Sequence, residues 1–200
     1  MELVIIQYNA GNIQSVLYAL ERMGQSAVVT DNPDRIRNAD KVIFPGVGEA
    51  SSAMQYLRER KLDSVITSLQ QPVLGICLGM QLLCSYSEEN DTTCLGIFSE
   101  RVVKMQAPAA KAGQRYKIPQ IGWNSIAQLH SPLMEGIAEN SYCYFVHGYY
   151  VPFGAQTIAT TDYIQPYSAA LHKNNFYGTQ FHPEKSAETG ARILQNFINL

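Results

Sequence analysis

Hydrophobic residues follow different patterns in the two halves of this 200-residue chain. In the first half, short continuous apolar runs alternate with segments whose apolar residues recur every three to four positions. This alternation is typical of buried parallel strands followed by amphipathic helices. It predicts a doubly wound, mostly parallel sheet with helices on both faces. The expected strands are 3–7, 27–30, 41–44 and 73–76, and the expected helices are 13–23, 50–60 and 62–69.

The second half changes character between Cys94 and Ile164, where short segments rich in aromatic and β-branched residues predominate. These segments predict an antiparallel extension of the sheet, including a strand over the tyrosine-rich stretch 142–150. Two more strands, joined at 173–175, and a closing helix from Ser186 complete the chain. The expected fold class is therefore α/β. No linker or shift in composition interrupts the chain, which predicts a single domain over residues 1–200.

Composition narrows the classes of function. The chain is 46% hydrophobic and has a net charge of -2, so nucleic acid and anionic membranes are not expected partners. No apolar run approaches the roughly 18 residues of a membrane span, and the chain begins without a basic region or cleavage signal. These features predict a cytoplasmic or other reducing compartment. The four cysteines show no paired metal spacing, so we expect no metal, no cofactor and three core cysteines: Cys84, Cys94 and Cys143.

Cys77 is the candidate nucleophile. It follows the apolar run 73–76, and Gly75 and Gly79 flank it at the spacing of a nucleophile elbow, a turn that only small neighbours fit. A helix beginning at Leu78 would point unpaired N–H groups at the sulfur, which favours a thiolate. The alternative interpretation is a buried apolar cysteine without chemistry, as many intracellular cysteines are.

A base and an orienting acid occur near the end of the chain. His182 follows an expected strand, and Pro183 turns the chain so that Glu184 can return toward the imidazole. Glu184 would hold the tautomer of His182 and stabilise the imidazolium that forms when His182 takes the thiol proton. The sequence therefore supplies nucleophile, base and orienting group.

The stretches Gly75-Ile76-Cys77-Leu78-Gly79-Met80-Gln81 and Phe181-His182-Pro183-Glu184 resemble the motifs of class I glutamine amidotransferases. The resemblance implies hydrolysis of glutamine to glutamate and ammonia by a triad of Cys77, His182 and Glu184. Further matching motifs indicate the branch of that family that serves histidine biosynthesis, and together the motifs span residues 8–186. These motifs are 8–16, 44–50, 121–124 and 144–149.

The resemblance also implies roles outside the triad. The N–H groups of Val47 and Leu78 match the donors of the oxyanion hole. The residues that match the family's substrate contacts are Gly46, Gly48, Gln81, Gly148 and Tyr149. Two positions depart from the family pattern: serine or threonine is commoner at Gly148, and histidine is commoner at Gln120.

The implied partner is a cyclase subunit of (β/α)₈-barrel fold, which would form a heterodimer with this chain and use its ammonia. Four residues match positions on the docking face, although their types alone would indicate a turn, two structural aromatics and a solvated charge. They are Asn12, Trp123, Tyr144 and Lys185. Trp and Tyr suit an interface because they bury a large area and keep a polar tip.

Three alternatives remain open at the level of sequence. A sister glutaminase of another pathway is disfavoured by Pro45-Gly46-Val47-Gly48, because such enzymes tend to have Pro-Gly-Gly-Pro there. A duplicate that feeds another amidation enzyme, such as one of surface-sugar synthesis, stays possible. The intact triad of residues argues against an inactive scaffold subunit.

Overall fold

The computed structural model describes residues 1–9, 12–107 and 116–200. Ala10 and Gly11 of the 8–16 motif lie outside the described residues. The helices are α1 (Ile13–Arg22), α2 (Pro33–Asn38), α3 (Ala50–Glu59), α4 (Leu62–Thr67), α5 (Leu78–Leu83) and α6 (Ala187–Asn199). The strands are β1 (Leu3–Ile6), β2 (Val28–Thr30), β3 (Lys41–Gly46), β4 (Val73–Cys77), β5 (Tyr86–Ser87), β6 (Thr92–Thr93), β7 (Arg101–Lys104), β8 (Gln120–Ile126), β9 (Ser141–His147), β10 (Tyr149–Tyr150), β11 (Thr157–Tyr163), β12 (Gln165–Lys173) and β13 (Phe176–Thr179).

A seven-stranded sheet in the order β11-β12-β13-β4-β3-β1-β2 forms the centre of the molecule. The five strands from β13 to β2 are parallel, and β11 and β12 extend the sheet in antiparallel fashion. The mostly parallel α/β fold class with an antiparallel extension is therefore confirmed. Pairs of apolar strands that run the same way need helices as crossovers, and the alternating pattern of the first half supplies them.

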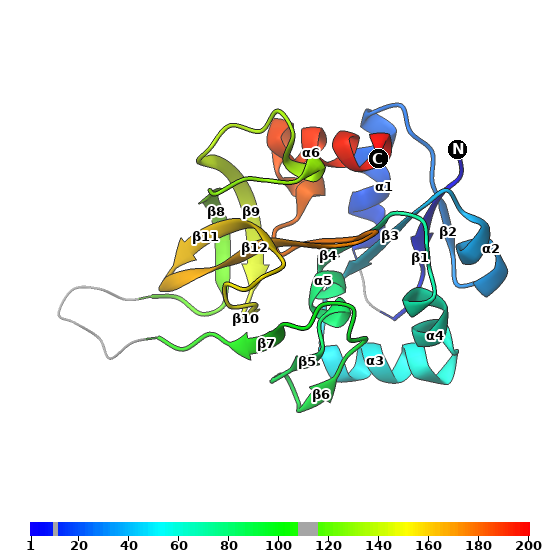
Figure 1. Ribbon diagram of the computed structural model, residues 1–200, viewed down its shortest axis with the longest axis horizontal. Helices are drawn as coiled ribbons and strands as arrows, with labels where there is room; N and C mark the ends of the chain where they lie inside the picture. The colour runs from blue at the N-terminus through cyan, green and yellow to red at the C-terminus, as the bar shows by residue number, and fades with distance from the viewer. Residues whose placement is uncertain (10–11, 108–115) are drawn as a thin grey trace.

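Both faces of this sheet are covered, as Figure 1 shows, with α1 and α6 on one side and α3, α4 and α5 on the other. Successive residues of β1 point to opposite faces: Leu3 and Ile5 pack with α1 and α6, whereas Val4 and Ile6 pack with α3 and α4. Burial on both faces explains why β1 is a continuous apolar run rather than an alternating one.

One helix was not expected from the sequence. The helix α2 has only six residues and buries only Ile36, so it shows no apolar periodicity. Its start is set by Asn32, whose side-chain oxygen accepts hydrogen bonds from the N–H groups of Asp34 and Arg35. Capping by asparagine followed by proline fixes a helix start without an amphipathic pattern.

The expected continuous strand over 142–150 is wrong in one respect, because it is interrupted at Gly148. β9 pairs with β8, while β10 pairs with β7 in a different, four-stranded sheet. The carbonyl oxygen of Gly148 accepts a hydrogen bond from the N–H of Met105. Glycine holds an extended conformation weakly, so the chain changes sheets at this residue.

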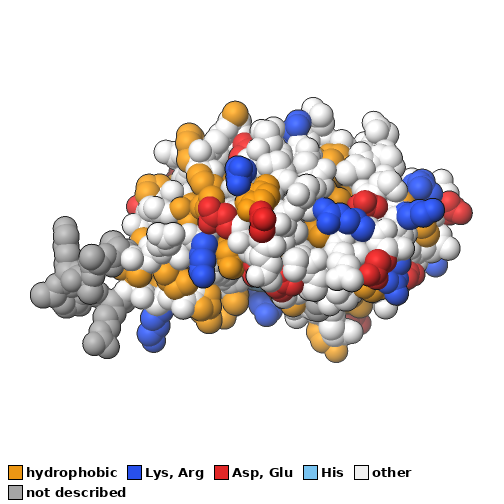
Figure 2. Space-filling model, turned by 90° about the horizontal axis from the view of Figure 1, so that it is seen from below, with side chains coloured by type: hydrophobic (Ala, Val, Ile, Leu, Met, Phe, Trp, Pro, Cys, Tyr) orange, Lys and Arg blue, Asp and Glu red, His pale blue; other side chains and the backbone are white. Residues whose placement is uncertain are grey.

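The surface is mixed in charge. Figure 2 shows acidic and basic side chains interspersed on the face seen from below, without a broad area of one sign. Among the described residues, no helix has the length and apolar character needed to cross a membrane.

The parallel strands end at a common edge of the sheet. β3 and β4 pair as far as Gly46 with Cys77, and β13 pairs with β4 as far as Thr179 with Ile76. The segments that follow β1, β3, β4 and β13 therefore meet beyond their carboxyl ends, which is where open α/β sheets bind ligands.

Candidate active site

Cys77 has the backbone conformation of a nucleophile elbow. Its φ is 53° and its ψ is -107°, a region that non-glycine residues rarely adopt. The neighbours are small because space is lacking: a Cβ atom at Gly79 would overlap the carbonyl oxygen of Phe44, and one at Gly75 would lie 2.8 Å from the nitrogen of Met80. The helix α5 starts at the next residue. Its first N–H groups have no acceptor within the helix, and the positive end of the helix dipole lies at Cys77, the N-cap residue.

His182 and Glu184 follow the end of β13, at the start of a short 3-10 helix (Pro183–Lys185), and both side chains are buried. Their atoms Nδ1 and Oε1 are 2.8 Å apart. The N–H of His182 donates to the carbonyl oxygen of Tyr144 at 2.9 Å, and Ser186 Oγ donates to the carbonyl oxygen of His182 at 2.6 Å. The segment that holds His182 is thus tied to β9 on one side and to the start of α6 on the other.

The protonated form of His182 is favoured in this environment. Burial alone lowers the pKa of an imidazole, but the charge and hydrogen bond of Cys77, together with those of Glu184, raise it. The combined effect raises the pKa of His182 to about 10.

Asn12, which was expected on a docking face, also contacts the triad. Its side-chain amide donates to Glu184 Oε1 and lies 3.4 Å from His182 Nδ1. His182 Nδ1 and the amide nitrogen of Asn12 both approach Glu184 Oε1, which can accept a hydrogen bond from each. Asn12 precedes α1 with a left-handed φ of 79°, a conformation that asparagine tolerates better than most residues.

A pocket of about 170 Å³ opens beside Cys77. Val47, Leu78, Gly48, Gln81, Gly148 and Tyr149, all expected at the site, line it together with Cys77. Gly46, the remaining expected substrate contact, ends β3 and lies behind the pocket against Tyr8. Gly148 has room for a larger residue, because an added Cβ would meet only Pro119, at 3.8 Å. Serine or threonine would therefore fit at this position.

Two glutamines, Gln81 on the wall of the pocket and Gln180 behind it, are joined by a hydrogen bond. Gln81 Nε2 donates to the carbonyl oxygen of Tyr149 and to Gln180 Oε1, both at 3.0 Å. Gln180 Nε2 in turn lies 3.8 Å from Cys77 Sγ. Gln180 was missed in the sequence, although its place two residues before His182 could have indicated it.

His147 also lines the pocket and was missed, although it lies inside the 144–149 motif. Its Nδ1 is 2.8 Å from the carbonyl oxygen of Tyr149, and its Nε2 is 3.0 Å from the hydroxyl of Tyr167. That hydroxyl contacts Gln120 Oε1 at 2.7 Å, so Gln120 completes a buried polar chain. Burial lowers the pKa of His147 to about 4, which keeps this imidazole neutral.

Glu89 is the one carboxylate on the wall of the pocket among the described residues. Burial raises its pKa, and its Oε2 accepts a hydrogen bond from the N–H of Ala50 at 2.8 Å. It comes from a turn between two short strands, β5 and β6, so the sequence contains no local pattern that indicates it. The pocket thus combines a nucleophile, N–H donors and one acidic group.

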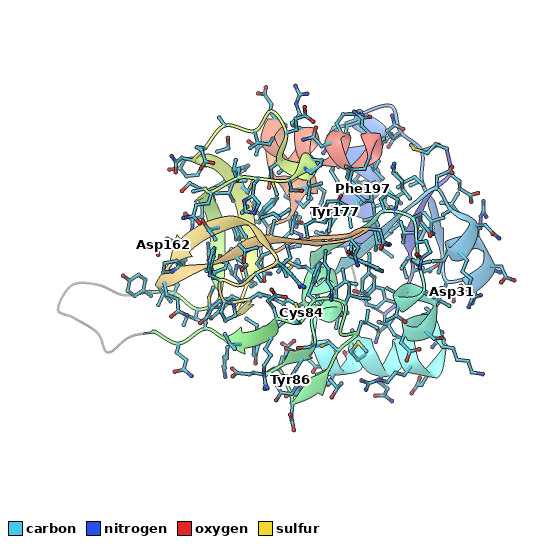
Figure 3. The ribbon with its side chains drawn as sticks, in the orientation of Figure 1. Asp31, Cys84, Tyr86, Asp162, Tyr177 and Phe197 are labelled. Carbon is cyan, nitrogen blue, oxygen red and sulfur yellow. The ribbon has the colours of Figure 1, made fainter. Side chains whose placement is uncertain are left out.

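The other cysteines are buried away from the pocket. Figure 3 places Cys84 on the side of the sheet that packs against α3. Burial raises the pKa of Cys84, and it raises that of Cys94 and Cys143 to about 12. Their thiols stay protonated and unreactive, as expected of core residues.

The strands β8 and β9 form a separate ribbon with an exposed aromatic face. Trp123 pairs with Tyr144 in register, and their rings meet edge to face at 5.9 Å. Ile121, Trp123 and Tyr142 are 64%, 52% and 60% exposed. We call these residues with Tyr144 the ribbon face. It leads toward the pocket, because Val146 pairs with Ile121 and its carbonyl oxygen lies 3.6 Å from Cys77 Sγ. Lys185 is exposed one residue beyond Glu184.

The sequence matches a model of one protein family and several curated proteins. The model of class-I glutamine amidotransferases matches residues 4–200. The imidazole glycerol phosphate synthase subunit HisH of Bacteroides fragilis is 56% identical over 200 residues, which covers 100% of both chains. The protein of the same name from Bacteroides thetaiotaomicron is 52% identical, again over 100% of both chains.

Solved structures with low sequence identity share the fold. A structure described as a glutamine amidotransferase has a TM-score of 0.73 at 17% identity, covering 98% of this chain and 97% of that chain. A chain of PurLQS from Thermotoga maritima has a TM-score of 0.71 at 15% identity, covering 99% of this chain and 97% of that chain.

Proposed function

The chain belongs to the class-I glutamine amidotransferase family, and we propose on this basis that it is the glutaminase subunit of imidazole glycerol phosphate synthase. It hydrolyses glutamine to glutamate and ammonia, as a single domain in the cytoplasm. A cyclase subunit uses the ammonia to make imidazole glycerol phosphate and AICAR. The observation that supports the chemistry best is the strained Cys77 beside a buried His182–Glu184 pair.

The reaction follows from this geometry. His182 takes the proton of Cys77, and the thiolate attacks the side-chain amide carbon of glutamine. The N–H groups of Leu78 and Val47 stabilise the oxyanion. When the carbon–nitrogen bond breaks, His182 gives its proton to the leaving ammonia. His182 then deprotonates a water molecule, which hydrolyses the thioester and releases glutamate and free Cys77.

Glutamine must also be held by its two charged ends. Glu89 is a suitable partner for the α-ammonium group, because it is the acidic group on the pocket wall. The backbone N–H groups near Gly148 and Tyr149 suit the α-carboxylate, and Gln81 holds that segment in place through the Tyr149 carbonyl. The side-chain amide then extends toward Cys77.

Glu89→Gln is expected to raise the KM for glutamine about 10- to 100-fold with little change in kcat. A hydrogen bond to a charged group contributes roughly 1.5–3 kcal/mol, and this one forms equally in the ground state and the transition state. Steady-state kinetics of the assembled complex measure the effect. Glu88→Gln is the matched control, because Glu88 does not line the pocket and contacts the N–H of Lys104 instead. A loss of kcat at constant KM would contradict this role.

Glu184→Gln is expected to lower the rate, but less than removal of Cys77 does, because Glu184 orients and stabilises rather than forms bonds. Loss of one triad member costs on the order of 10³-fold or more, and the orienting acid usually costs the least. Rates measured in the assembled complex give the comparison. Activity equal to the unmodified chain would remove Glu184 from the triad.

The effect of Glu184→Gln on the free energy of unfolding should depend on pH. Because the pKa of His182 is raised from 6.5 to about 10, its proton stabilises the fold fully below pH 6.5 and no longer above about pH 10. Glu184→Gln removes one of the groups that raise this pKa. Its loss of unfolding free energy should therefore be largest below pH 6.5 and shrink toward pH 10, as measured by urea unfolding. Glu188→Gln, at an exposed position of α6, should show no such trend.

The cyclase is proposed to be a (β/α)₈ barrel that docks on the ribbon face, near Asn12 and Lys185. Exposed apolar side chains gathered in one place mark interaction surfaces in soluble proteins. The ribbon face is continuous with the pocket through Val146, so a partner seated there would receive ammonia as it leaves Cys77. Lys185 supplies a charge at the rim, where it orients a partner.

The alternatives are not favoured. An inactive scaffold would have no need for a strained elbow, which costs stability, or for an acid–base pair buried beside it. A duplicate that feeds another amidation enzyme would share the whole triad. The curated relatives that match over their full length have the name of the histidine-pathway subunit.

A further inference from the structure

The hydroxyl of Tyr8 is buried and finds no hydrogen-bond partner within the described residues. Tyr8 follows β1, is 6% exposed, and packs its ring on Phe44 of β3 with centroids 5.2 Å apart. A buried hydroxyl without a partner costs stability, and phenylalanine would keep the same ring contacts at no such cost. The hydroxyl therefore calls for an explanation beyond packing.

The Tyr8 hydroxyl lies against Gly46, the residue that precedes the oxyanion donor Val47. A Cβ atom at Gly46 would overlap it, and the same position is 3.0 Å from Leu78 Cβ and 3.1 Å from the nitrogen of Gly79. Tyr8 thus occupies the space that a side chain at residue 46 would need, between the end of β3 and the first turn of α5. Val47 and Leu78 line the pocket, whereas Tyr8 does not.

The geometry of a trans peptide links the direction of the Val47 N–H to that of the Gly46 carbonyl oxygen. The N–H and C=O of one peptide unit point in opposite directions. When the Val47 N–H points into the pocket toward an oxyanion, the carbonyl oxygen of Gly46 must point away from it, into the protein. A buried carbonyl needs a donor. The Tyr8 hydroxyl is a buried side-chain donor beside Gly46 that has no partner within the described residues.

We propose that Tyr8 is a positioning residue for the glutaminase reaction. Its hydroxyl donates a hydrogen bond to the Gly46 carbonyl oxygen when the Gly46–Val47 peptide presents the Val47 N–H to the substrate. The hydroxyl that lacks a partner within the described residues then has an acceptor. This role rests on the proposed glutaminase function, and it accounts for a tyrosine facing a glycine across β1 and β3.

The test is Tyr8→Phe in the complex of the full chain with its cyclase partner. The kcat for glutamate release should fall about tenfold at constant KM, because one net hydrogen bond made only in the transition state is lost. The melting temperature of the free chain should rise by about 2–4 °C, since a costly buried hydroxyl is removed. Synthesis from added ammonia should not change.

Tyr177→Phe is the matched control. Tyr177 is buried on the opposite face of the sheet, beside Phe197 of α6, and should change neither kcat nor the ammonia-supported rate (Figure 3). An unchanged kcat in Tyr8→Phe would overturn the inference. So would a fall in kcat accompanied by a lower melting temperature, which would indicate a structural role. No glutamate release by the unmodified complex would instead overturn the glutaminase function and, with it, this inference.

Discussion

Cys77→Ala is expected to abolish glutamine-dependent synthesis in the assembled complex and to leave synthesis from added ammonia at its normal rate. Only the production of ammonia uses the thiol, so the cyclase reaction remains intact. Loss of the nucleophile of a cooperating triad costs on the order of 10³-fold or more. The measurement is the rate of product formation with glutamine and, separately, with an ammonium salt.

Cys84→Ala provides the control for this experiment. Cys84 is buried two helical turns along the chain from Cys77, and its thiol faces the carbonyl oxygen of Met80 at 3.5 Å. Glutamine-dependent activity should survive in this variant. Glutamine-supported turnover that persists in Cys77→Ala would instead show that another group attacks the amide.

The isolated chain is expected to be a poor glutaminase. The cyclase should raise its activity, and the ligand of the cyclase should raise it further. The oxyanion hole needs the Val47 N–H. Because valine is β-branched and resists positive φ values, the peptide that carries this N–H does not rotate freely. If the Gly46–Val47 peptide points away at rest, one donor is missing, and one such donor contributes roughly 10²–10³ in rate. The partner must then bind the rotated state more tightly than the resting state.

Three assays decide this point: glutamate release by the chain alone, with the cyclase, and with the cyclase plus a substrate analogue. The rate should rise at each step. Full activity in the free chain, unchanged by either addition, would rule out the gating. It would also favour a self-sufficient glutaminase over a subunit of imidazole glycerol phosphate synthase.

Much of the fold follows from local sequence patterns. The strands β1, β3 and β4 are continuous apolar runs because both of their faces are buried, and such runs can be predicted from the sequence. The sequence also predicts the elbow, because Gly75 and Gly79 stand where a Cβ atom would overlap neighbouring atoms. The structure pairs β13 with β4 in parallel, and this pairing, which the sequence pattern does not give, brings the segment that contains His182 to the same edge of the sheet as Cys77.

Contacts between segments distant in the chain could not be predicted in the same way. Glu89 reaches the pocket from the β5–β6 turn, and no pattern in that turn marks it. The unpaired hydroxyl of Tyr8 has meaning only beside Gly46, 38 positions along the sequence and one strand away. The break at Gly148 depends on which strands compete for the two halves of the 142–150 segment, and pairing partners are a property of the whole fold.

The most direct test of the central claim is mass spectrometry of the complex, quenched with acid during turnover of glutamine. The expected result is a glutamyl group bound as a thioester on the peptide that contains Cys77, present with glutamine and absent after its exhaustion. The same adduct should be missing in Cys77→Ala. Steady release of glutamate without any adduct on Cys77, or with the adduct on another residue, would contradict the mechanism proposed for this chain.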